Sequence, residues 1–548
     1  MTRFPANPRR TETHKRPAFR PQAESLEGRQ LLTAGDLDLS FGTGGYVLTS
    51  PRVESQSAGY SSDAAFGGVE AQPDGNILVA GPSSKTTGTW PFSTTTNNWG
   101  VVRLTSSGSL DPTFGSGGRV LTTVGNQDSN NQPHGTALQP DGKLVVVGTI
   151  DVDTKVGRTT TTDRDFGVIR YLPSGALDPS FGPNGSGVVT TPFSTSQSSS
   201  NTFAGAVDLQ ADGKIVVGGY AYNGSTTQQA SMVRYNTNGT LDTSFGAGGK
   251  VLTTVNGVSS AWIKELAVLP DGKILALGSK FIARYNPNGS LDTTFGSGGT
   301  GVTVPNLGST GTLSMFSMVI QSMGAIVAGG RVENTGSSSN GDLCLVRFTP
   351  SGVLDTSFAG TGAFVRDLGG FDTIGPKGLQ LQADGKILAA AQGSSTPGKT
   401  VAARFLPDGT LDTTFGTGGL VVRSFGAADS SFNGSALQPD GKLVAVGVAQ
   451  TAHGSTTDTN FLVVRFLGDP APLSAASAAP RGTTTPSLGS SRPEDTILTT
   501  VSAPAVIPGG QDTSAPNPLM PSTDGDLTAL ATDWLRAGRK RSRSSPVR

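Results

Sequence analysis

The stretch Gly175-Ala-Leu-Asp-Pro-Ser-Phe181, followed by Gly182, recurs with small changes seven times along the chain. The seven phenylalanines lie 50 to 73 residues apart, at Phe41, Phe114, Phe181, Phe245, Phe295, Phe358 and Phe415. Repeats of this length, with short β-branched runs between Gly, Asn and Asp turns, are typical of a ring of small β-sheets. The sequence therefore predicts an all-β fold, a seven-bladed β-propeller of four-stranded antiparallel blades.

The second repeat shows how one blade is predicted to be built. Four runs have the character of strands: 118–124, 135–139, 143–148 and 166–172. Pro140-Asp-Gly142 is expected to form a tight turn, because proline fixes φ and glycine accepts a positive φ. Residues 144–147 of the third run are all apolar, as expected for a strand that packs on both faces. Together the runs predict a four-stranded meander.

An arginine in each fourth run precedes the aspartate of the Leu-Asp dipeptide by eight residues. The pairs are Arg103–Asp111, Arg170–Asp178, Arg234–Asp242, Arg284–Asp292, Arg347–Asp355 and Arg404–Asp412. The seventh arginine, Arg465, has no such aspartate after it, and Asp38 at the start of the chain is left over. We expect the segment 35–45 to dock beside the last blade, pair Asp38 with Arg465 and close the ring, because an open sheet edge would aggregate.

These arginines and aspartates are predicted to be structural. Seven equivalent sites cannot be seven active sites around one axis, and buried charges are normally paired. The three histidines are scattered, and Cys344 alternates with apolar residues as a small buried side chain does. We therefore predict that the protein is not an enzyme, and we assign no catalytic residue.

The composition excludes several classes of protein. The chain has 548 residues with 41 basic and 41 acidic side chains, so no net charge attracts a nucleic acid to the whole molecule. Its single cysteine can form neither an intrachain disulfide nor a thiolate zinc site. No run of eighteen apolar residues is present, so no transmembrane span is expected.

The two recurring motifs, G-x-L-D-x-x-F-G-x-G-G and Q-P-D-G-K-I-x-V-x-G, closely resemble the bacterial delta-60 repeat family. The resemblance covers about residues 35–467. It implies a propeller on large, mostly secreted or cell-surface proteins, and it implies no enzymatic activity. The sequence departs from the motifs locally, at Ala359-Gly-Thr-Gly362 and at Ser322-Met-Gly324.

The two ends of the chain differ from the repeats. Residues 1–34 are basic, and Leu26-Glu-Gly-Arg-Gln-Leu-Leu-Thr33 resembles the leader of many planctomycete surface proteins, with a disordered arm as the alternative. Residues 468–523, rich in Pro, Ser, Thr and Ala, predict a disordered linker. Residues 524–548 predict a short amphipathic helix and a basic tail, either frayed or in contact with a membrane or an anionic surface polymer.

Variable connections are expected on one side of the blades. The Pro-Asp-Gly turns and the Leu-Asp-x-x-Phe segments are nearly constant and share the opposite side, so a ligand is expected among the variable loops. The loop 82–99 carries Trp90, Phe92 and Trp99, which suit stacking on a sugar or contact with a protein, unless they only fix the loop to its blade.

Four aspartates flank the next variable loop. Asp151, Asp153, Asp163 and Asp165 could supply oxygen ligands to calcium, although their spacing is not that of a known calcium loop and a solvated polar loop is the alternative. No other cofactor is expected.

Two functions remain open from the sequence. The first is a non-enzymatic, secreted or cell-surface scaffold that binds a protein or carbohydrate partner through its variable loops. The second is a polysaccharide hydrolase or lyase with one site at the mouth of the propeller channel, which would require non-repeating acidic or histidine residues near the axis. A nucleic acid partner is disfavoured, because the single basic cluster at the end of the chain has no basic fold behind it.

Overall fold

The computed structural model describes residues 32–469, without 53–59, 67, 88–93, 126–130, 157–158, 194–201, 223–226, 309–310, 334–340, 371, 394–397, 427–428 and 454–455. The chain divides into two compact units, Met1–Leu32 and Thr33–Arg548, and the second contains the repeats. The predicted leader, linker and tail lie almost wholly outside the described residues, in 1–31 and 470–548.

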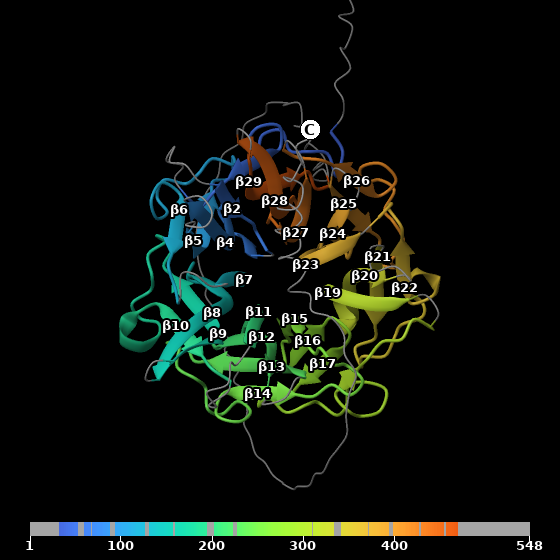
Figure 1. Cartoon of the computed structure of the whole chain (residues 1–548). Helices are drawn as coiled ribbons and strands as arrows, with labels where there is room; N and C mark the ends of the chain where they lie inside the picture. The colour runs from blue at the N-terminus through green and yellow to red at the C-terminus, as the bar shows by residue number, and fades with distance from the viewer. Residues whose placement is uncertain are drawn as a thin grey trace, which may run out of the picture. The chain divides into compact units, whose positions relative to one another are not determined.

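The described residues form antiparallel sheets whose strands follow one another in the chain (Figure 1). Five sheets have four strands each. They are β7 (Gln132–Leu138), β8 (Leu144–Val156), β9 (Thr159–Tyr171) and β10 (Val188–Thr191); β11 (Thr202–Leu209), β12 (Ile215–Tyr222), β13 (Gln228–Tyr235) and β14 (Lys250–Thr253); β15 (Ile263–Val268), β16 (Ile274–Gly278), β17 (Ile282–Tyr285) and β18 (Val302–Thr303); β19 (Thr312–Ile320), β20 (Ile326–Glu333), β21 (Gly341–Phe348) and β22 (Ala363–Arg366); β23 (Thr373–Leu381), β24 (Ile387–Gly393), β25 (Lys399–Phe405) and β26 (Leu420–Arg423).

A sixth, nine-stranded sheet joins the two ends of the repeat region. One half contains β3 (Gly68–Ala71), β4 (Ile77–Thr87), β5 (Thr94–Leu104) and β6 (Arg119–Thr122). The other contains β27 (Ser430–Leu437), β28 (Leu443–His453), β29 (Thr456–Phe466) and, from the start of the chain, β1 (Tyr46–Thr49), which pairs antiparallel with β29. The strand β2 (Tyr60–Asp63) lies between the halves, antiparallel to β4 and parallel to β29. The prediction of an all-β fold with four-stranded antiparallel sheets is confirmed.

The assignment of strands to blades requires a correction. The run 118–124, predicted to begin the second blade, contains β6, which pairs with β5 of the sheet before it. The cause is the Leu-Asp-x-x-Phe segment, which turns the chain back on the strand that precedes it. Asp111 N–H donates to Arg103 O and Arg103 N–H donates to Gly118 O, each at 2.9 Å, so the next run returns along the same sheet.

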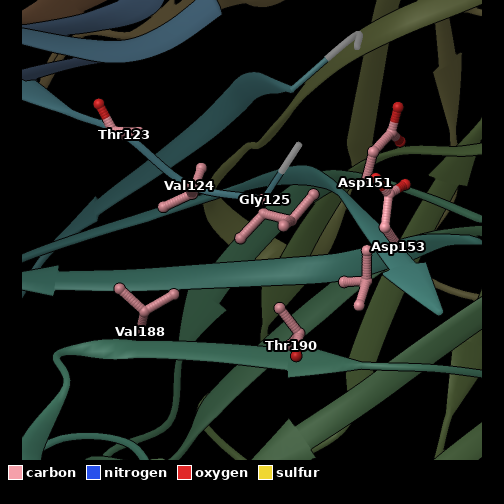
Figure 2. A pocket seen from close by; sticks show the side chains of 9 residues that line it. Thr123, Val124, Gly125, Asp151, Asp153, Val188 and Thr190 are labelled. Carbon is pink, nitrogen blue, oxygen red and sulfur yellow. The ribbon is translucent and has the colours of Figure 1, made fainter. Parts of the chain in front are cut away.

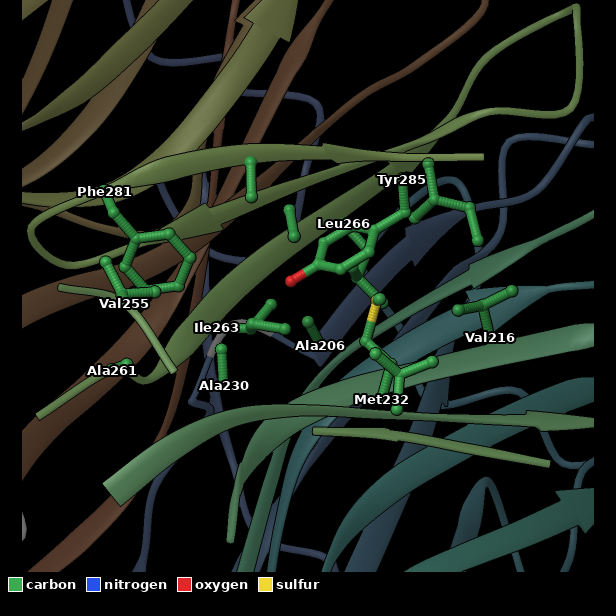
Figure 3. Close-up of a cluster of buried hydrophobic side chains, with 14 of the residues drawn as sticks. Ala206, Val216, Ala230, Met232, Val255, Ala261, Ile263, Leu266, Phe281 and Tyr285 are labelled. Atoms are coloured by element: carbon green, nitrogen blue, oxygen red, sulfur yellow. The ribbon is translucent and has the colours of Figure 1, made fainter. Parts of the chain in front are cut away.

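The hydrophobic core lies between sheets that are consecutive in the chain. The cluster in Figure 3 combines Val216 and Met232 of one sheet with Ile263, Phe281 and Tyr285 of the next. Similar clusters join each further pair of consecutive sheets. One more cluster joins β3, β4 and β5 to β27, β28 and β29. Strands buried on both faces explain the apolar runs of the sequence.

Several of the predicted variable loops are strands. The β8–β9 hairpin pairs continuously from Leu144 and Tyr171 to Val156 and Thr159, and β4 pairs with β5 as far as Thr87. Threonine predominates in these extensions, and β-branched residues favour the extended backbone. The prediction underestimated these hairpins because their polar residues suggested loops. No helix among the described residues is long and apolar enough to cross a membrane.

Candidate functional site

Each predicted arginine lies beside its predicted aspartate. In all seven cases the guanidinium Nε is 2.7–2.8 Å from the aspartate Oδ2. The guanidinium also lies 4.4–5.1 Å from the ring centroid of the repeat's phenylalanine. The pKa of Asp242 is lowered to about 2, first by the hydrogen bond from the Ser244 hydroxyl and further by Arg234. Each of these arginines is ion-paired with its aspartate, which fits a structural role.

The same arginines connect each sheet to the next. Arg103 Nη1 donates to Pro173 O at 2.6 Å, and Arg170, Arg234, Arg284 and Arg347 make the same contact to the turn of the sheet after their own. Arg465 donates to Ser106 O at 2.5 Å, which joins the last strand of the repeats to the first sheet. Arg404 is the exception, because its Nη1 donates to the carboxylate of Asp469.

Trp99 is not exposed. Its side chain is fully buried and packs with Phe114, Ile150 and Ile169 between two sheets, so its ring belongs to the core and not to a binding surface. Trp99 lies in β5, directly before the buried residues at the end of this strand. A large apolar indole at this position favours burial. Trp90 and Phe92 lie outside the described residues.

The four aspartates lie on two adjoining strands, β8 and β9. Asp151 and Asp153 lie beside a cavity of about 490 Å³ that is also lined by Thr123, Val188 and Thr190 (Figure 2). Asp151 is buried and ion-paired with Arg164 at 3.3 Å. Within the described part of the chain, no three His, Cys, Asp or Glu side chains are grouped to hold a metal ion.

Asp163 and Asp165 lie on the opposite face of this hairpin, because their register partners are Val152 and Ile150. Asp165 is 6% exposed, and burial, followed by the negative charge of Asp163, raises its pKa to about 6. Calcium binding by these aspartates stays a prediction.

A repeated irregularity marks the first strand of most sheets. The register of this strand against the second slips at one place, and one residue bulges out at His134, Gly205, Lys264, Phe316 and Asn433. In β23 the slip is larger. Ile374 pairs with Ala391 and Leu379 with Ala389, so an advance of five residues along β23 corresponds to two residues along β24. Bulges redirect side chains, and here equivalent positions carry chemically different residues.

Lys377 lies in the large bulge of β23, with a φ of 51° that side chains other than glycine rarely adopt. Its Nζ is 2.9 Å from Glu70 Oε1 of β3 and donates to Thr136 O of β7. The Thr136 hydroxyl donates to the same Glu70 oxygen at 2.8 Å. The Lys377 and Glu70 side chains are 26% and 19% exposed, so water reaches both. A strained residue that joins three sheets is a candidate functional feature.

Two further carboxylates interact with this pair. Asp208 of β11 accepts a hydrogen bond from Val268 N–H at 2.7 Å, and Glu265 of β15 accepts one from Met318 N–H. Burial raises the pKa of Glu265 to about 7 and also raises that of Asp208, while Lys377 opposes both shifts. Burial lowers the pKa of Lys377, but Glu70, Glu265 and Asp208 raise it by more. We call Glu70, Asp208, Glu265 and Lys377 the inner-strand cluster.

Aromatic rings form a connected arc in and just before the first strands of the sheets. The ring centroids of Phe66 and His134 are 6.3 Å apart, those of His134 and Phe203 are 4.2 Å apart, and those of Phe203 and Trp262 are 4.3 Å apart. The ammonium of Lys264 lies over Trp262 and 5.8 Å from the ring of Phe316. Burial lowers the pKa of His134 to about 3, so its ring is neutral. The arc lies toward the end where the β8–β9 hairpin extends.

Sequence reasoning missed the inner-strand cluster and the arc. Their residues stand three to eight positions before the Pro-Asp-Gly turn or its equivalent, where the repeats differ most in chemistry. An alignment of the repeats on this turn would have placed Lys377, His134 and Lys264 in one column. Cys344 is fully buried, and burial raises the pKa of its thiol to about 12.

The comparison with protein families matches six segments of the chain. They match the model described as "Domain of unknown function (DUF5122) beta-propeller", at residues 72–114, 139–181, 210–245, 269–295, 321–358 and 382–415. Each segment runs from the residue before a Pro-Asp-Gly turn, or its equivalent, to the phenylalanine of the following motif. Among curated proteins, none matches the sequence.

The comparison with solved structures gives matches of low sequence identity and low TM-score. A protein of unknown function from Dyadobacter fermentans is 12% identical, with a TM-score of 0.39, over 78% of this chain and 98% of its own. A PL25 ulvan lyase is 11% identical, with a TM-score of 0.36, over 75% and 96% of the two chains. The NanB sialidase of Streptococcus pneumoniae is 11% identical, with a TM-score of 0.33, over 78% and 71%. From its sheets and the six matched segments, the chain is an all-β protein built of β-propeller repeats.

Proposed function

We propose that residues 35–467 form a seven-bladed β-propeller whose ring is closed by the N-terminal segment. Three observations support this arrangement: the pairing of β1 with β29, the core cluster between β3–β5 and β27–β29, and the Arg465–Asp38 pair. The resemblance of the motifs to delta-60 repeats agrees with it. A closed ring leaves no sheet edge between the first and last repeats.

The function that we propose is a non-enzymatic binding scaffold. The observation that carries it is the aromatic arc, which lies toward the same end of the sheets as the extended hairpins. Aromatic side chains with a polar edge are frequent in recognition surfaces for proteins and sugars. The partner is therefore expected on the variable side, next to Trp262 and Phe66, which are both partly exposed.

The same proposal places the protein outside the cell, secreted or on the cell surface. It rests on the planctomycete-type leader in residues 1–34 and on the usual location of delta-60 proteins. The basic tail would then contact an anionic surface polymer or a membrane.

A glycan array probed with the full-length chain tests the binding function. Trp262→Ala should lose the bound glycans, whereas Met323→Ala should keep them, because Met323 is 95% exposed in the turn that replaces Pro-Asp-Gly on the other side. Equal binding by both variants, with unchanged melting temperatures, would contradict the proposed surface. A negative array would direct the search to protein partners.

The alternative is a polysaccharide hydrolase or lyase, and the inner-strand cluster favours it. Glu265, with a pKa near 7, can act as an acid or a base at neutral pH, and it is a non-repeating carboxylate of the kind that an enzyme needs. Incubation with polysaccharides and measurement of new chain ends separates the two functions. Release of fragments by the wild type and not by Glu265→Gln would replace the binding function with the enzymatic one.

A further inference from the structure

A second repeated feature lies on the side of the Pro-Asp-Gly turns, where each sheet meets the next. A glutamine precedes most of the Pro-Asp-Gly or equivalent turns, and the side chains of Gln139, Gln321 and Gln438 lie against the turns of the following sheet. Gln438 shows the arrangement, because its amide donates to Gly75 O at 3.0 Å across the contact between β27–β29 and β3–β5.

The carbonyl oxygens of these glutamines share one property. Each Oε1 is covered from solvent, and among the described residues none donates a hydrogen bond to it. This holds for Gln72, Gln139, Gln210, Gln382 and Gln438. A buried polar atom without a partner is destabilising. One such atom is an accident of packing, but its recurrence at five equivalent positions is a property of the repeat.

The contact between the sheets of β7–β10 and β11–β14 holds a cavity of about 470 Å³ at this position. Gln139, Asp141 and Ser180 line it from one sheet, and Gly213 and Asn238 from the next. Its lining is mostly apolar with several polar and charged groups among it, and the Asp141 side chain at its rim is 53% exposed. The volume and this mixed lining fit one small hydroxylated ring, which has apolar faces and hydrogen-bonding edges.

We propose that these glutamine sites are repeated binding sites for single saccharide residues, separate from the variable side. A sugar hydroxyl donates to the glutamine Oε1 after the amide turns toward the cavity, a rotation about a bond with a broad torsional preference. The other hydroxyls of the sugar form hydrogen bonds with Asp141, Ser180 and Asn238, which line the cavity. A chain with several equivalent sites binds a polysaccharide by avidity, because each further contact is intramolecular.

The sequence supplies its own controls. Leu269 replaces the glutamine before the turn at 270–272, so that site lacks the acceptor. Gln321 also differs, because its Oε1 accepts from Arg347 Nη1 at 3.3 Å. The proposal therefore predicts binding at the five glutamine positions and none at Leu269.

Saturation-transfer NMR of the full-length chain with methyl β-D-glucopyranoside and methyl β-D-galactopyranoside tests this. The wild type should show transfer to the sugar, and a variant with all five glutamines changed to leucine should lose it while the protein stays folded. Leucine at position 269 shows that the fold tolerates this residue. Transfer that persists in the five-fold variant, or no transfer to the wild type, would overturn the proposal.

Crystals of the wild type and of Gln139→Leu, soaked in the same glycoside, locate the sites and remain informative if the five-fold variant fails to fold. Sugar density at the glutamine sites, absent at Leu269 and lost only at position 139 in the variant, is the expected result. Leu269→Gln should create a further site. Ordered water only, binding at crystal concentration only, or equal density at Leu269 would each overturn the proposal.

Discussion

Arg465 Nε lies 2.8 Å from Asp38 Oδ2, although 427 positions separate the two residues in the sequence. The pair has the same geometry as the six that are eight residues apart, including the Arg465 guanidinium over the Phe41 ring at 4.5 Å. The start of the chain thus takes the place that the following turn occupies in the other repeats.

Asp38→Ala should destabilise the domain about as much as Asp242→Ala. Both changes leave an arginine that is 4–5% exposed without its carboxylate, and breaking a buried pair costs about 3 kcal/mol. Urea unfolding of the two variants measures the loss. A silent Asp38→Ala beside a destabilising Asp242→Ala would show that the N-terminal segment is dispensable.

Glu265 should make the domain less stable as the pH rises from 4.5 to 7. Its pKa is about 7 in the folded protein and about 4.5 in the unfolded chain, so the folded state holds the proton more tightly. The stabilisation is complete below pH 4.5 and is lost as the pH passes 7. Glu265→Gln should remove this dependence and gain about 1–3 kcal/mol at pH 8.

The measurement compares melting temperatures of the wild type and Glu265→Gln at several pH values. Asp63 and Asp165 also have pKa values raised to about 6 by burial, so the difference between the two proteins isolates Glu265. Asp141→Asn, at a largely exposed side chain, is the control. Parallel curves for wild type and Glu265→Gln would contradict the prediction.

Lys377 and Glu70 should be energetically coupled. A double-mutant cycle with Lys377→Met and Glu70→Gln should give a coupling energy on the order of 1 kcal/mol, limited by the water that reaches both side chains. Lys377→Gly separates strain from pairing, because glycine accepts the φ of 51°. A coupling energy of zero would mean that the two side chains are neighbours without mutual dependence.

Calcium should raise the melting temperature if the aspartates on β8 and β9 bind it. The gain should disappear in Asp165→Asn, since bound calcium would stabilise the ionised Asp165 carboxylate, which burial and Asp163 disfavour, and an amide has no such charge. Magnesium is the control, because its smaller shell demands stricter geometry. No shift with calcium would remove the metal from further consideration.

Sequence patterns predicted those parts of the fold that repeat. The Leu-Asp-x-x-Phe motif and the eight-residue spacing predicted the repeated sheets and the pairing of Arg103 with Asp111. Backbone turns and such local pairs depend on residues that are close in the chain, so a repeated motif reveals them. The same patterns assigned residues 118–124 to the wrong sheet, because a short strand-like run does not indicate which sheet it joins. The pairing partner is decided by the hydrogen bonds that follow Asp111.

The candidate site was hidden for the opposite reason. Glu70, Asp208, Glu265 and Lys377 come from four repeats, and the bulges that bring them together leave no mark in composition. Trp99 shows a related error, because an aromatic residue in a polar segment suggests exposure. The position of Trp99 in the pairing of β4 with β5 directs its side chain into the core between two sheets.

The hydrogen bond from Gly35 N–H to Leu467 O, at 2.9 Å, brings residues from the two ends of the repeat region into contact. A gene that joined residue 469 to residue 33 by a short linker, and began between β8 and β9, would encode a circular permutant with the same sheets. The point at which the ribosome starts is then a matter of genetic history, and the order of synthesis of the repeats can be changed without changing what they build.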